Sequence, residues 1–396
     1  MCQWAPITSR ELLGPAEGEA QLKQMSCTKP LIRFSDGEVT SLKKYIEYGR
    51  RYKSTFYMGD GPYLNESYEK KLLRQLKKED CTLLPCGHCA ACKLTASSSW
   101  ANRMEMELPY HKNAWFLTLT YDDEHVPWSY NNGLGINKWT GEVEVENLTL
   151  NYKDMQDFWK RLRRYREYHN IDDGQLMYFQ AGEYGGKTHR PHYHAIVYDL
   201  NIKIEDLKEY KRKNGIVYYN CDWITKIWGN GHVVITEASW KAFAYTARYT
   251  TKKVYGSESK KYYSDMGILP EKCMMSKNPA IGMKYYEEHK NEIYKKDSIQ
   301  LKNGRSCKPP RYFDKLFDLE HSQSGPLSKA ESEEIEETTE KAESEELKAI
   351  KRERRRIAND ALFAQLKQTG LTMQEYYNLK NKKMQERMKK LIREEI

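Results

Sequence analysis

Between residues 113 and 255, the spacing of hydrophobic residues switches repeatedly between the period of a strand and that of a helix. Residues 114–121 read AWFLTLTY, a β-branched and aromatic run that predicts a strand. Asn151 is a good N-cap for a helix. The apolar residues after it recur at helical spacing, namely Met155, Phe158, Trp159, Leu162 and Tyr165. The sequence therefore predicts a strand and then an amphipathic helix.

The same region continues with further strands and helices. Residues 176–180 and 193–198 predict two strands, and the glycines at 185 and 186 predict the turn that joins them. We further expect a helix over 204–213, a short strand over 231–235 and a helix from about 239 to 253. This order indicates an α+β fold with an antiparallel sheet.

The composition divides the rest of the chain into flanking regions. Residues 1–80 form a basic amino-terminal region, and residues 81–112 hold a cysteine-rich element and a helix. Residues 113–255 are the core, and residues 256–320 extend it. Residues 321–396 are a charged tail that we interpret as a solvated helix, joined through a linker at 322–326.

Charge and hydropathy narrow the class of protein. Hydrophobic residues make up 39% of the chain and charged residues 31%, and no window is apolar enough for a membrane-spanning helix. The first residues lack a signal-peptide pattern, so we expect a cytoplasmic protein with no membrane partner. The net charge of +9 and the 30 tyrosines suit a partner that offers phosphates and stackable bases.

A histidine pair at the start of the second hairpin strand is the first candidate site. His192 and His194 are two positions apart, so on a strand their side chains point to the same face. Antiparallel pairing across the turn can bring Glu183 back toward them. Two imidazoles and a carboxylate suit a divalent ion with open coordination positions, as a metal acting on a phosphate requires. Two surface histidines on a half-exposed strand would give the same pattern.

Two tyrosines on the last predicted helix form the second candidate site. Tyr245 and Tyr249 are four positions apart and share a helix face, with Lys252 about one turn further. Because phenol has a pKa of about 10, a tyrosine nucleophile needs a nearby cation or metal, and Lys252 or Lys253 could supply the charge. Packing tyrosines at helical spacing are the competing interpretation.

Three crowded cysteines form the third candidate site. Cys86, Cys89 and Cys92 give two overlapping C-x2-C steps, typical of metal-binding thiolates in a reducing compartment. A structural zinc site needs a fourth ligand, and our predicted set takes Cys27. The candidates for this position are Cys27, Cys81 and His88. An iron–sulfur cluster uses similar spacing and is the alternative.

Hydroxyl and basic side chains near these motifs could contact the phosphates of a nucleic acid. Thr118 and Thr120 share one face of the first strand, although β-propensity explains them equally well. The first helix carries a basic face whose phosphate contacts would weaken with salt, formed by Arg161, Arg163 and Arg164. A solvated helix face is the alternative interpretation.

The order of these motifs resembles that of a known family. FLTLTY (116–121), GEYGGKTHRPHYHA (182–195) and AYTARYTTKK (244–253) resemble motifs one, two and three of the HUH endonucleases. PCGHCAAC, DMQDFWKRLRR, WGNGHVVITEASWKAFAYTARY and KPPRYFDKL are similar to segments of the rolling-circle replication initiators of small tailless single-stranded DNA phages, the gokushovirus-like Microviridae. The likeness extends over roughly residues 25 to 315.

The resemblance implies a fold, a reaction and partners. The fold would be an RRM-like antiparallel sheet with helices on one face, a central histidine strand and the tyrosine helix beside it. The reaction would be site-specific nicking of one DNA strand at the phage origin through a 5′-phosphotyrosine, followed by rejoining that releases circular single strands. The partners would be single-stranded DNA, supercoiled replicative-form DNA and the helicase and polymerase of the bacterial host.

The resemblance also assigns roles to the candidate residues. The ligands for Mg²⁺ or Mn²⁺ would be Glu183, His192 and His194. The two helix tyrosines would be the paired nucleophiles, with Lys252 matching the lysine of motif three and Lys253 as a near substitute. The cysteine cluster, with structural Zn²⁺, would stabilise an element packed on the core.

Two alternatives remain on the sequence alone. An HUH transposase would use one tyrosine, whereas a relaxase is disfavoured because both tyrosines follow the histidine motif. A non-catalytic, zinc-containing protein that binds nucleic acid would form no covalent adduct with DNA.

Overall fold

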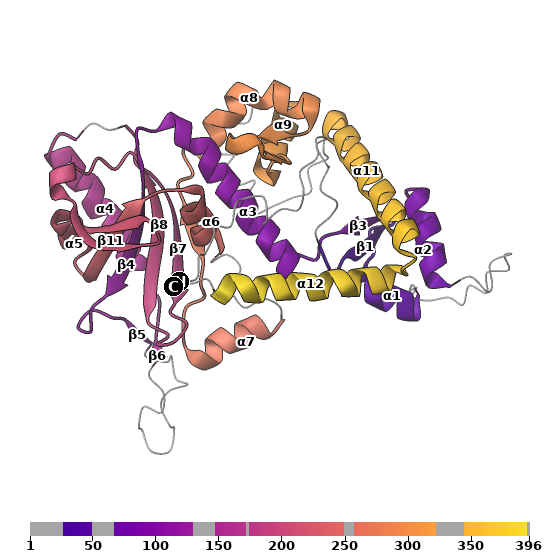
Figure 1. Ribbon diagram of the computed structural model, residues 1–396, viewed down its shortest axis with the longest axis horizontal. Helices are drawn as coiled ribbons and strands as arrows, with labels where there is room; N and C mark the ends of the chain where they lie inside the picture. Colours follow the sequence, from indigo (N-terminus) through magenta and orange to yellow (C-terminus); the bar gives the residue numbers. More distant parts are fainter. Residues whose placement is uncertain are drawn as a thin grey trace, which may run out of the picture.

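A seven-stranded antiparallel sheet forms the centre of the largest unit in the computed structural model (Figure 1). The structure describes residues 27–49, 67–129, 147–171, 174–248, 257–321 and 344–393. The strands lie in the order β12 (Cys273–Met275), β7 (Met177–Tyr184), β8 (Pro191–Tyr198), β4 (Ala114–Tyr121), β11 (Gly231–Glu237), β10 (Ile216–Asn220) and β9 (Lys208–Lys213). The α+β fold and its antiparallel sheet are thus confirmed, and the histidine strand β8 lies in the interior of the sheet, between β7 and β4.

Helices cover both faces of this sheet. The helices α3 (Ala90–Glu107) and α6 (Trp240–Arg248) pack on one face, and α4 (Tyr152–Tyr168) and α5 (Asp222–Trp228) pack on the other. The expectation of helices on one face is therefore wrong. Tyr193 and Ala195 of β8 are buried on the α4 face, whereas Ile196 and Tyr198 are buried on the α3 face. A strand that is apolar on both faces needs a covering layer on each.

Residues 204–213 do not form the predicted helix. A short 3₁₀ turn, η2 (Ile204–Asp206), leads into β9, which is the edge strand of the sheet. Asn214 and Gly215 join β9 to β10 with positive φ angles of 51° and 77°, as a two-residue hairpin turn requires. Every residue of β9 is exposed, so no buried alternation marks this strand in the sequence.

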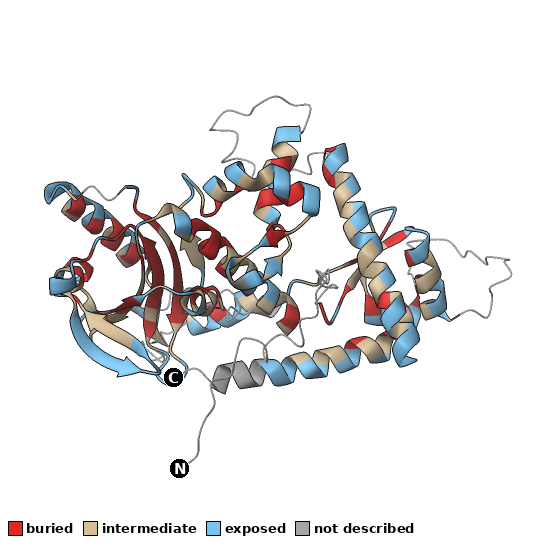
Figure 2. Cartoon of the chain, turned by 45° about the horizontal axis from the view of Figure 1, so that its top comes forward, coloured by how far each residue is buried: buried red, intermediate tan, exposed pale blue. Residues whose placement is uncertain are grey.

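The tail packs on the amino-terminal residues. A three-stranded sheet has the order β2 (Val39–Ser41), β1 (Leu31–Phe34) and β3 (Cys81–Leu84), accompanied by α1 (Leu42–Tyr48) and α2 (Tyr68–Lys77). The tail contributes α11 (Glu345–Thr369) and α12 (Met373–Arg393). Leu362, Met373 and Tyr377 share one buried core with Ile32 and Phe34 (Figure 2). These helices therefore differ from a solvated tail, because their apolar stripe is buried; the predicted linker lies outside the described residues.

The extension after the core connects α3 to α11. Its elements are α7 (Ser257–Met266), α8 (Met283–Lys296), β13 (Ile299–Gln300), η4 (Lys302–Gly304), β14 (Ser306–Cys307) and α9 (Arg311–His321). Met106 of α3 and Leu347 of α11 share a buried cluster with residues of α8 and α9. The guanidinium of Arg354 binds the carboxylates of Asp297 and Asp314, so a charged contact also holds α11 to this extension. The remaining short elements are η1 (Leu108–Tyr110), β5 (Trp128–Ser129) and β6 (Asn147–Leu148).

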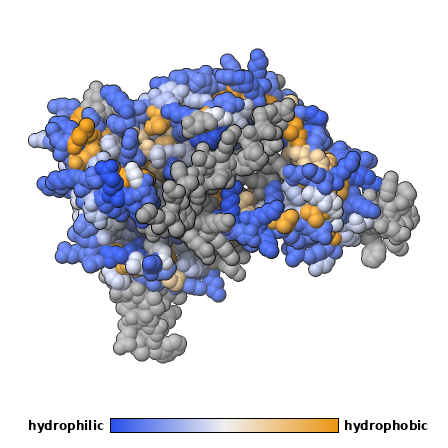
Figure 3. Space-filling view, viewed as in Figure 1, coloured by the Kyte–Doolittle hydropathy of each residue, from blue (hydrophilic) through white to orange (hydrophobic). Residues whose placement is uncertain are grey.

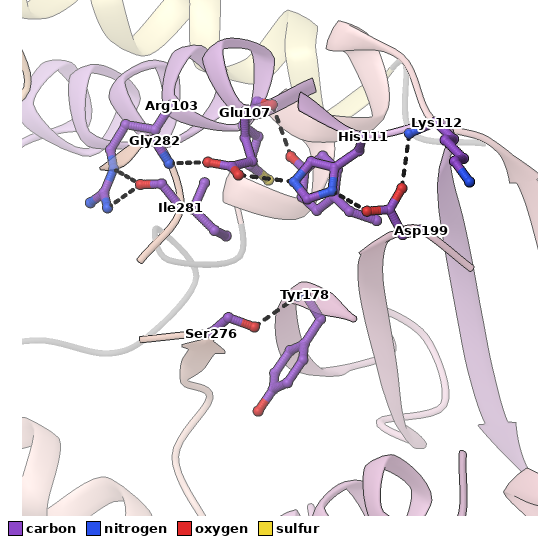
Figure 4. Close-up of polar contacts among 11 residues, drawn as sticks. Arg103, Glu107, His111, Lys112, Tyr178, Asp199, Ser276, Ile281 and Gly282 are labelled. Carbon is purple, nitrogen blue, oxygen red and sulfur yellow. Dashed lines mark hydrogen bonds and ion pairs between the residues drawn. The ribbon is translucent and has the colours of Figure 1, made fainter. Parts of the chain in front are cut away.

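A buried network of charged side chains fixes the end of α3 to the sheet (Figure 4). His111 Nε2 lies 2.9 Å from Glu107 Oε1, and His111 Nδ1 lies 2.5 Å from Asp199 Oδ2. Glu107 also accepts a hydrogen bond from the backbone N–H of Gly282. Burial lowers the pKa of His111, but hydrogen bonds to Glu107 and Asp199, and their charges, outweigh burial and raise this pKa above its usual value.

Hydrophilic residues dominate the face of the molecule seen in Figure 3, with apolar residues in small separate groups. Among the described residues, no helix has the length and apolar character needed to cross a membrane.

Candidate active site

The hairpin of β7 and β8 brings together the three predicted ligands of a divalent ion. Glu183 lies directly opposite His192 in the antiparallel register, and His194 is two residues further along the same face. Glu183 Oε2 lies 3.2 Å from His192 Nε2 and 3.4 Å from His194 Nε2. Glu183 and His194 are buried, whereas the side chain of His192 keeps 19% of its surface exposed. The site therefore opens to solvent beside His192.

Neighbouring oxygen atoms orient both imidazole rings. Thr118 Oγ1 lies 3.1 Å from Nδ1 of His194, and the carbonyl oxygen of Arg190 lies 3.2 Å from Nδ1 of His192. The two Nε2 atoms therefore both face Glu183, as expected for histidines whose second nitrogen binds a metal. The ligand atoms of all three residues lie within 4.8 Å of one another. This donor set of two imidazole nitrogens and one carboxylate suits a divalent ion.

The electrostatics of the carboxylate agree with this arrangement. Burial alone would raise the pKa of Glu183. Hydrogen bonds and charge from His192 and His194 outweigh burial and hold the pKa of this carboxyl well below its usual range. Glu183 is therefore ionised at neutral pH and available as an anionic ligand.

Helix α6 places the first predicted nucleophile against the histidines. The ring centroid of Tyr245 lies 5.2 Å from that of His194 and 6.0 Å from that of Phe116, both edge-on. The guanidinium carbon of Arg248 lies 5.5 Å from the same tyrosine ring. The other predicted catalytic residues lie outside the described residues, namely Tyr249, Lys252 and Lys253.

The predicted phosphate contacts divide between two locations. Thr118 and Thr120 lie opposite His194 and His192 in the register of β4 and β8, and the hydroxyl of Thr120 donates to the carbonyl of His232 at 3.3 Å. The arginines of α4 lie over the opposite face of the sheet. Arg161 donates to the backbone carbonyls at the end of α5, at 2.7 and 2.8 Å. The other two, Arg163 and Arg164, are exposed.

The structure also brings four cysteines together. The sulfur atoms of Cys27, Cys86, Cys89 and Cys92 lie within 4.8 Å of one another. Cys81 and His88, the other two candidates for the fourth position, are not among the ligands of this group. Hydrogen bonds with Cys27 and Cys92 hold the pKa of Cys89 well below its usual range.

Three neighbours of the site were not predicted from the sequence. The ring of Phe116 stacks on that of His194, with centroids 5.3 Å apart. Arg190 positions His192 through its carbonyl, while its guanidinium binds Asp123. Arg248 lies over Tyr245. Only the shared face of Phe116 and Thr118, and the three-residue spacing of Arg248 from Tyr245, could have indicated them.

Comparison with known proteins covers this site. The family model for replication-associated protein ORF2 matches residues 114–254, which include both the histidine hairpin and α6. The chain is 35% identical over 242 residues to replication-associated protein ORF2 of Spiroplasma virus 4, covering 60% of this chain and 68% of that protein. It is 28% identical over 243 residues to replication-associated protein VP4 of Bdellovibrio phage phiMH2K, covering 60% of this chain and 69% of the relative.

A third relative is replication-associated protein ORF4 of Chlamydia phage 1, which is 32% identical over 238 residues. This match covers 59% of the chain and 53% of the relative. No solved structure matches the chain. The extent and identity of these matches show that the chain belongs to the ORF2 family of phage replication-associated proteins.

Proposed function

We propose that this chain initiates rolling-circle replication by nicking one DNA strand at the phage origin and attaching itself to the new 5′ end. The convergence of Glu183, His192 and His194, with Tyr245 packed against His194, carries this proposal. The histidines and the carboxylate come from one hairpin, and the tyrosine comes from a helix that packs on the same sheet face. Binding and chemistry would therefore share a single surface.

The reaction would be a transesterification. The phenolic oxygen of Tyr245 attacks the phosphorus, a phosphorus–oxygen bond forms, and the bond to the 3′-oxygen breaks. The phenol's proton leaves with solvent, and the departing 3′-oxygen takes up a proton to give the 3′-hydroxyl. Mg²⁺ or Mn²⁺ held by Glu183, His192 and His194 would make the phosphorus more electrophilic and stabilise the leaving oxygen. Arg248, over the ring of Tyr245, would favour the phenolate and attract the phosphate.

Release of a circular strand requires a second transfer, for which Tyr249 would serve. Four positions separate it from Tyr245, so on a continuing helix both hydroxyls would lie on one face. One tyrosine would hold the 5′ end while the other cuts the regenerated origin. The energy of the broken ester is kept in the tyrosine–phosphate bond, so rejoining needs no ATP. Lys252 and Lys253 would add positive charge beside the tyrosines.

The proposed partners follow from this reaction. The substrate would be origin DNA, supercoiled as the replicative form or single-stranded, in the cytoplasm of the bacterial host. The freed 3′-hydroxyl would prime a host polymerase, and a host helicase would separate the strands. A transposase with a single nucleophile, or a zinc-containing protein that only binds nucleic acid, would differ in its covalent product.

An adduct assay tests this function. The full chain is incubated with circular single-stranded DNA carrying the origin and with Mg²⁺ or Mn²⁺, then denatured in SDS and examined for DNA linked to protein. We expect a metal-dependent adduct that is lost when Tyr245→Phe and Tyr249→Phe are combined and when His192→Ala removes a ligand. Tyr168→Phe is the matched control, because Tyr168 is 82% exposed on α4, over the other sheet face.

The outcomes separate the alternatives. An adduct that persists in the double tyrosine variant would overturn the assignment of the nucleophiles. An adduct that depends on one tyrosine alone in every step, including rejoining, would favour a transposase. DNA binding without an adduct under either metal would favour the binding protein.

A further inference from the structure

The four clustered cysteines come from two segments that are far apart in the sequence. Cys27 precedes β1, whereas the other three lie in the turn before α3 and in its first turn. Backbone N–H groups point at the sulfurs: that of Cys86 lies 3.3 Å from Cys27 Sγ, and that of Thr28 lies 3.4 Å from Cys89 Sγ. Cys89 is the N-cap of α3, and its sulfur accepts from the N–H of Cys92. Such N–H groups and the positive end of a helix favour thiolates over thiols.

The size of the cluster fits one metal ion. A zinc–sulfur bond is about 2.3 Å long, so the sulfurs of a tetrahedral site lie roughly 3.8 Å apart. Cys27 Sγ and Cys89 Sγ are separated by 3.8 Å, and all four sulfurs lie within 4.8 Å of one another. An iron–sulfur cluster spreads its cysteine ligands over several iron atoms. The compact arrangement therefore favours a mononuclear tetrathiolate site, in which the structurally preferred ion is Zn²⁺.

Helix α12 closes this site from the other end of the chain. Met384 packs against the cysteines, and the hydroxyl of Thr28 donates to Asn381 Oδ1 at 2.8 Å. Lys380 lies within electrostatic range of Cys27 and Cys89. Four thiolates around Zn²⁺ carry a net charge of −2, so a lysine beside them supplies compensating charge.

The same helix α3 that begins at the cysteines supports the helix that carries Tyr245. The hydroxyl of Ser97 donates to the carbonyl of Ala244 at 3.3 Å, and Asn102 Oδ1 accepts from the indole of Trp240 at 3.4 Å. Ala101 and Met104 pack in one buried cluster with residues of α6. A constraint on the start of α3 is therefore carried along one rigid helix to α6.

We infer that Cys27, Cys86, Cys89 and Cys92 bind one structural Zn²⁺, which joins the amino-terminal segment to α3 beneath α12 and so fixes the support of α6. Loading the site displaces protons from the cysteines to solvent, so metal affinity falls as the pH is lowered. Zinc loss would free the start of α3 and expose the face of α12 that covers the cysteines.

Metal content tests the site directly. The full chain, purified from zinc-supplemented cells without chelators, is expected to hold one zinc per chain by mass spectrometry. Co²⁺ exchanged for zinc should give the intense sulfur-to-metal and ligand-field absorption of a tetrahedral thiolate site. Cys89→Ser should lower zinc content several-fold, whereas Cys81→Ser should retain it, because Cys81 is a buried cysteine of the same unit that pairs with Phe34. A wild-type chain without zinc or cobalt bands, iron in place of zinc, or equal losses in both variants would overturn the assignment.

Hydrogen exchange of the wild-type chain tests the role of the site. Stripping zinc is expected to speed amide exchange in α12, the first turns of α3 and α6, while β9 and β10, at the far edge of the sheet, stay unchanged. Unchanged exchange in all three helices would show that zinc does not hold them. Neither measurement uses DNA cleavage, so each stands whether or not the chain nicks DNA.

Discussion

Replacing Thr118 with valine removes one hydroxyl beside the histidine pair while keeping the shape of the side chain. In the structure that hydroxyl lies 3.1 Å from Nδ1 of His194, whose side chain keeps only 5% of its surface exposed. Without it, the buried ring loses the contact that fixes its orientation and keeps Nε2 toward Glu183. Such partners of metal-binding histidines change metal affinity by about 10–100-fold. We expect about 10-fold, or roughly 1.4 kcal/mol, because His192 keeps its own partner, the Arg190 carbonyl.

Titration of the metal-free protein with Mn²⁺ by calorimetry measures this loss. Thr120→Val is the matched control, because Thr120 lies on the same strand face but its hydroxyl donates to the carbonyl of His232 rather than to a histidine ring. The control should bind Mn²⁺ with the wild-type affinity. In the adduct assay, Thr118→Val should be defective at low Mn²⁺ and recover at saturating Mn²⁺.

The competing interpretation makes the opposite prediction. If Thr118 and Thr120 contact the phosphate backbone, both variants weaken the binding of single-stranded DNA, and the weakening persists at saturating metal. Equal Mn²⁺ affinity in wild type and Thr118→Val would refute the positioning role. Thermal unfolding of each variant, compared with wild type, controls for a general loss of stability.

Two further predictions concern stability. The raised pKa of His111 means that its charged contacts stabilise the fold fully below its unfolded pKa of about 6.5 and lose this effect as pH rises through the folded pKa; the free energy of unfolding should therefore fall over that window in wild type, and less in His111→Gln, when denaturation is followed from pH 5.5 to 9. An equal fall in both would remove His111 as the cause. Gly231 has a φ of +141°, and a Cβ there would meet Asp122 N and Thr120 O at 2.5 Å, so Gly231→Ala should cost about 2–5 kcal/mol in the same assay; a cost under about 0.5 kcal/mol would contradict this geometry.

Strong local patterns predicted most of the nuclease core. The alternation in β4 and the N-cap and apolar stripe of α4 gave elements close to those observed, since each pattern is complete within its own segment. Residues 204–213 failed because the exposed edge strand has no buried face, and its Asn214-Gly215 turn was the signal that mattered. The docking of the tail failed for another reason: the partner of its apolar stripe lies some 300 residues earlier, and periodicity names a buried face without naming what covers it.

The histidine site was predictable because every step is local. His192 and His194 share a face by strand geometry, and a short hairpin fixes the register that sets Glu183 opposite His192. The neighbours Phe116 and Thr118 depend instead on pairing between β4 and β8, which are separated by about 70 residues. Nothing within either strand specifies that register, so the role of Thr118 as a partner of His194 could only come from the structure.

The fourth cysteine shows what decides between equal candidates. Cys81 is nearer in sequence to Cys86 than Cys27 is, yet it pairs with Phe34 at the far end of β3, five positions from Cys86. Five extended residues span roughly 17 Å, far more than a metal site allows. The same antiparallel register pairs Leu31 with Leu84 and so brings the residues before β1 beside the turn that follows β3, where Cys27 meets the other three sulfurs. The choice of ligand therefore depends on the pairing of β1 with β3, and a register shift there would dismantle the site without touching a cysteine.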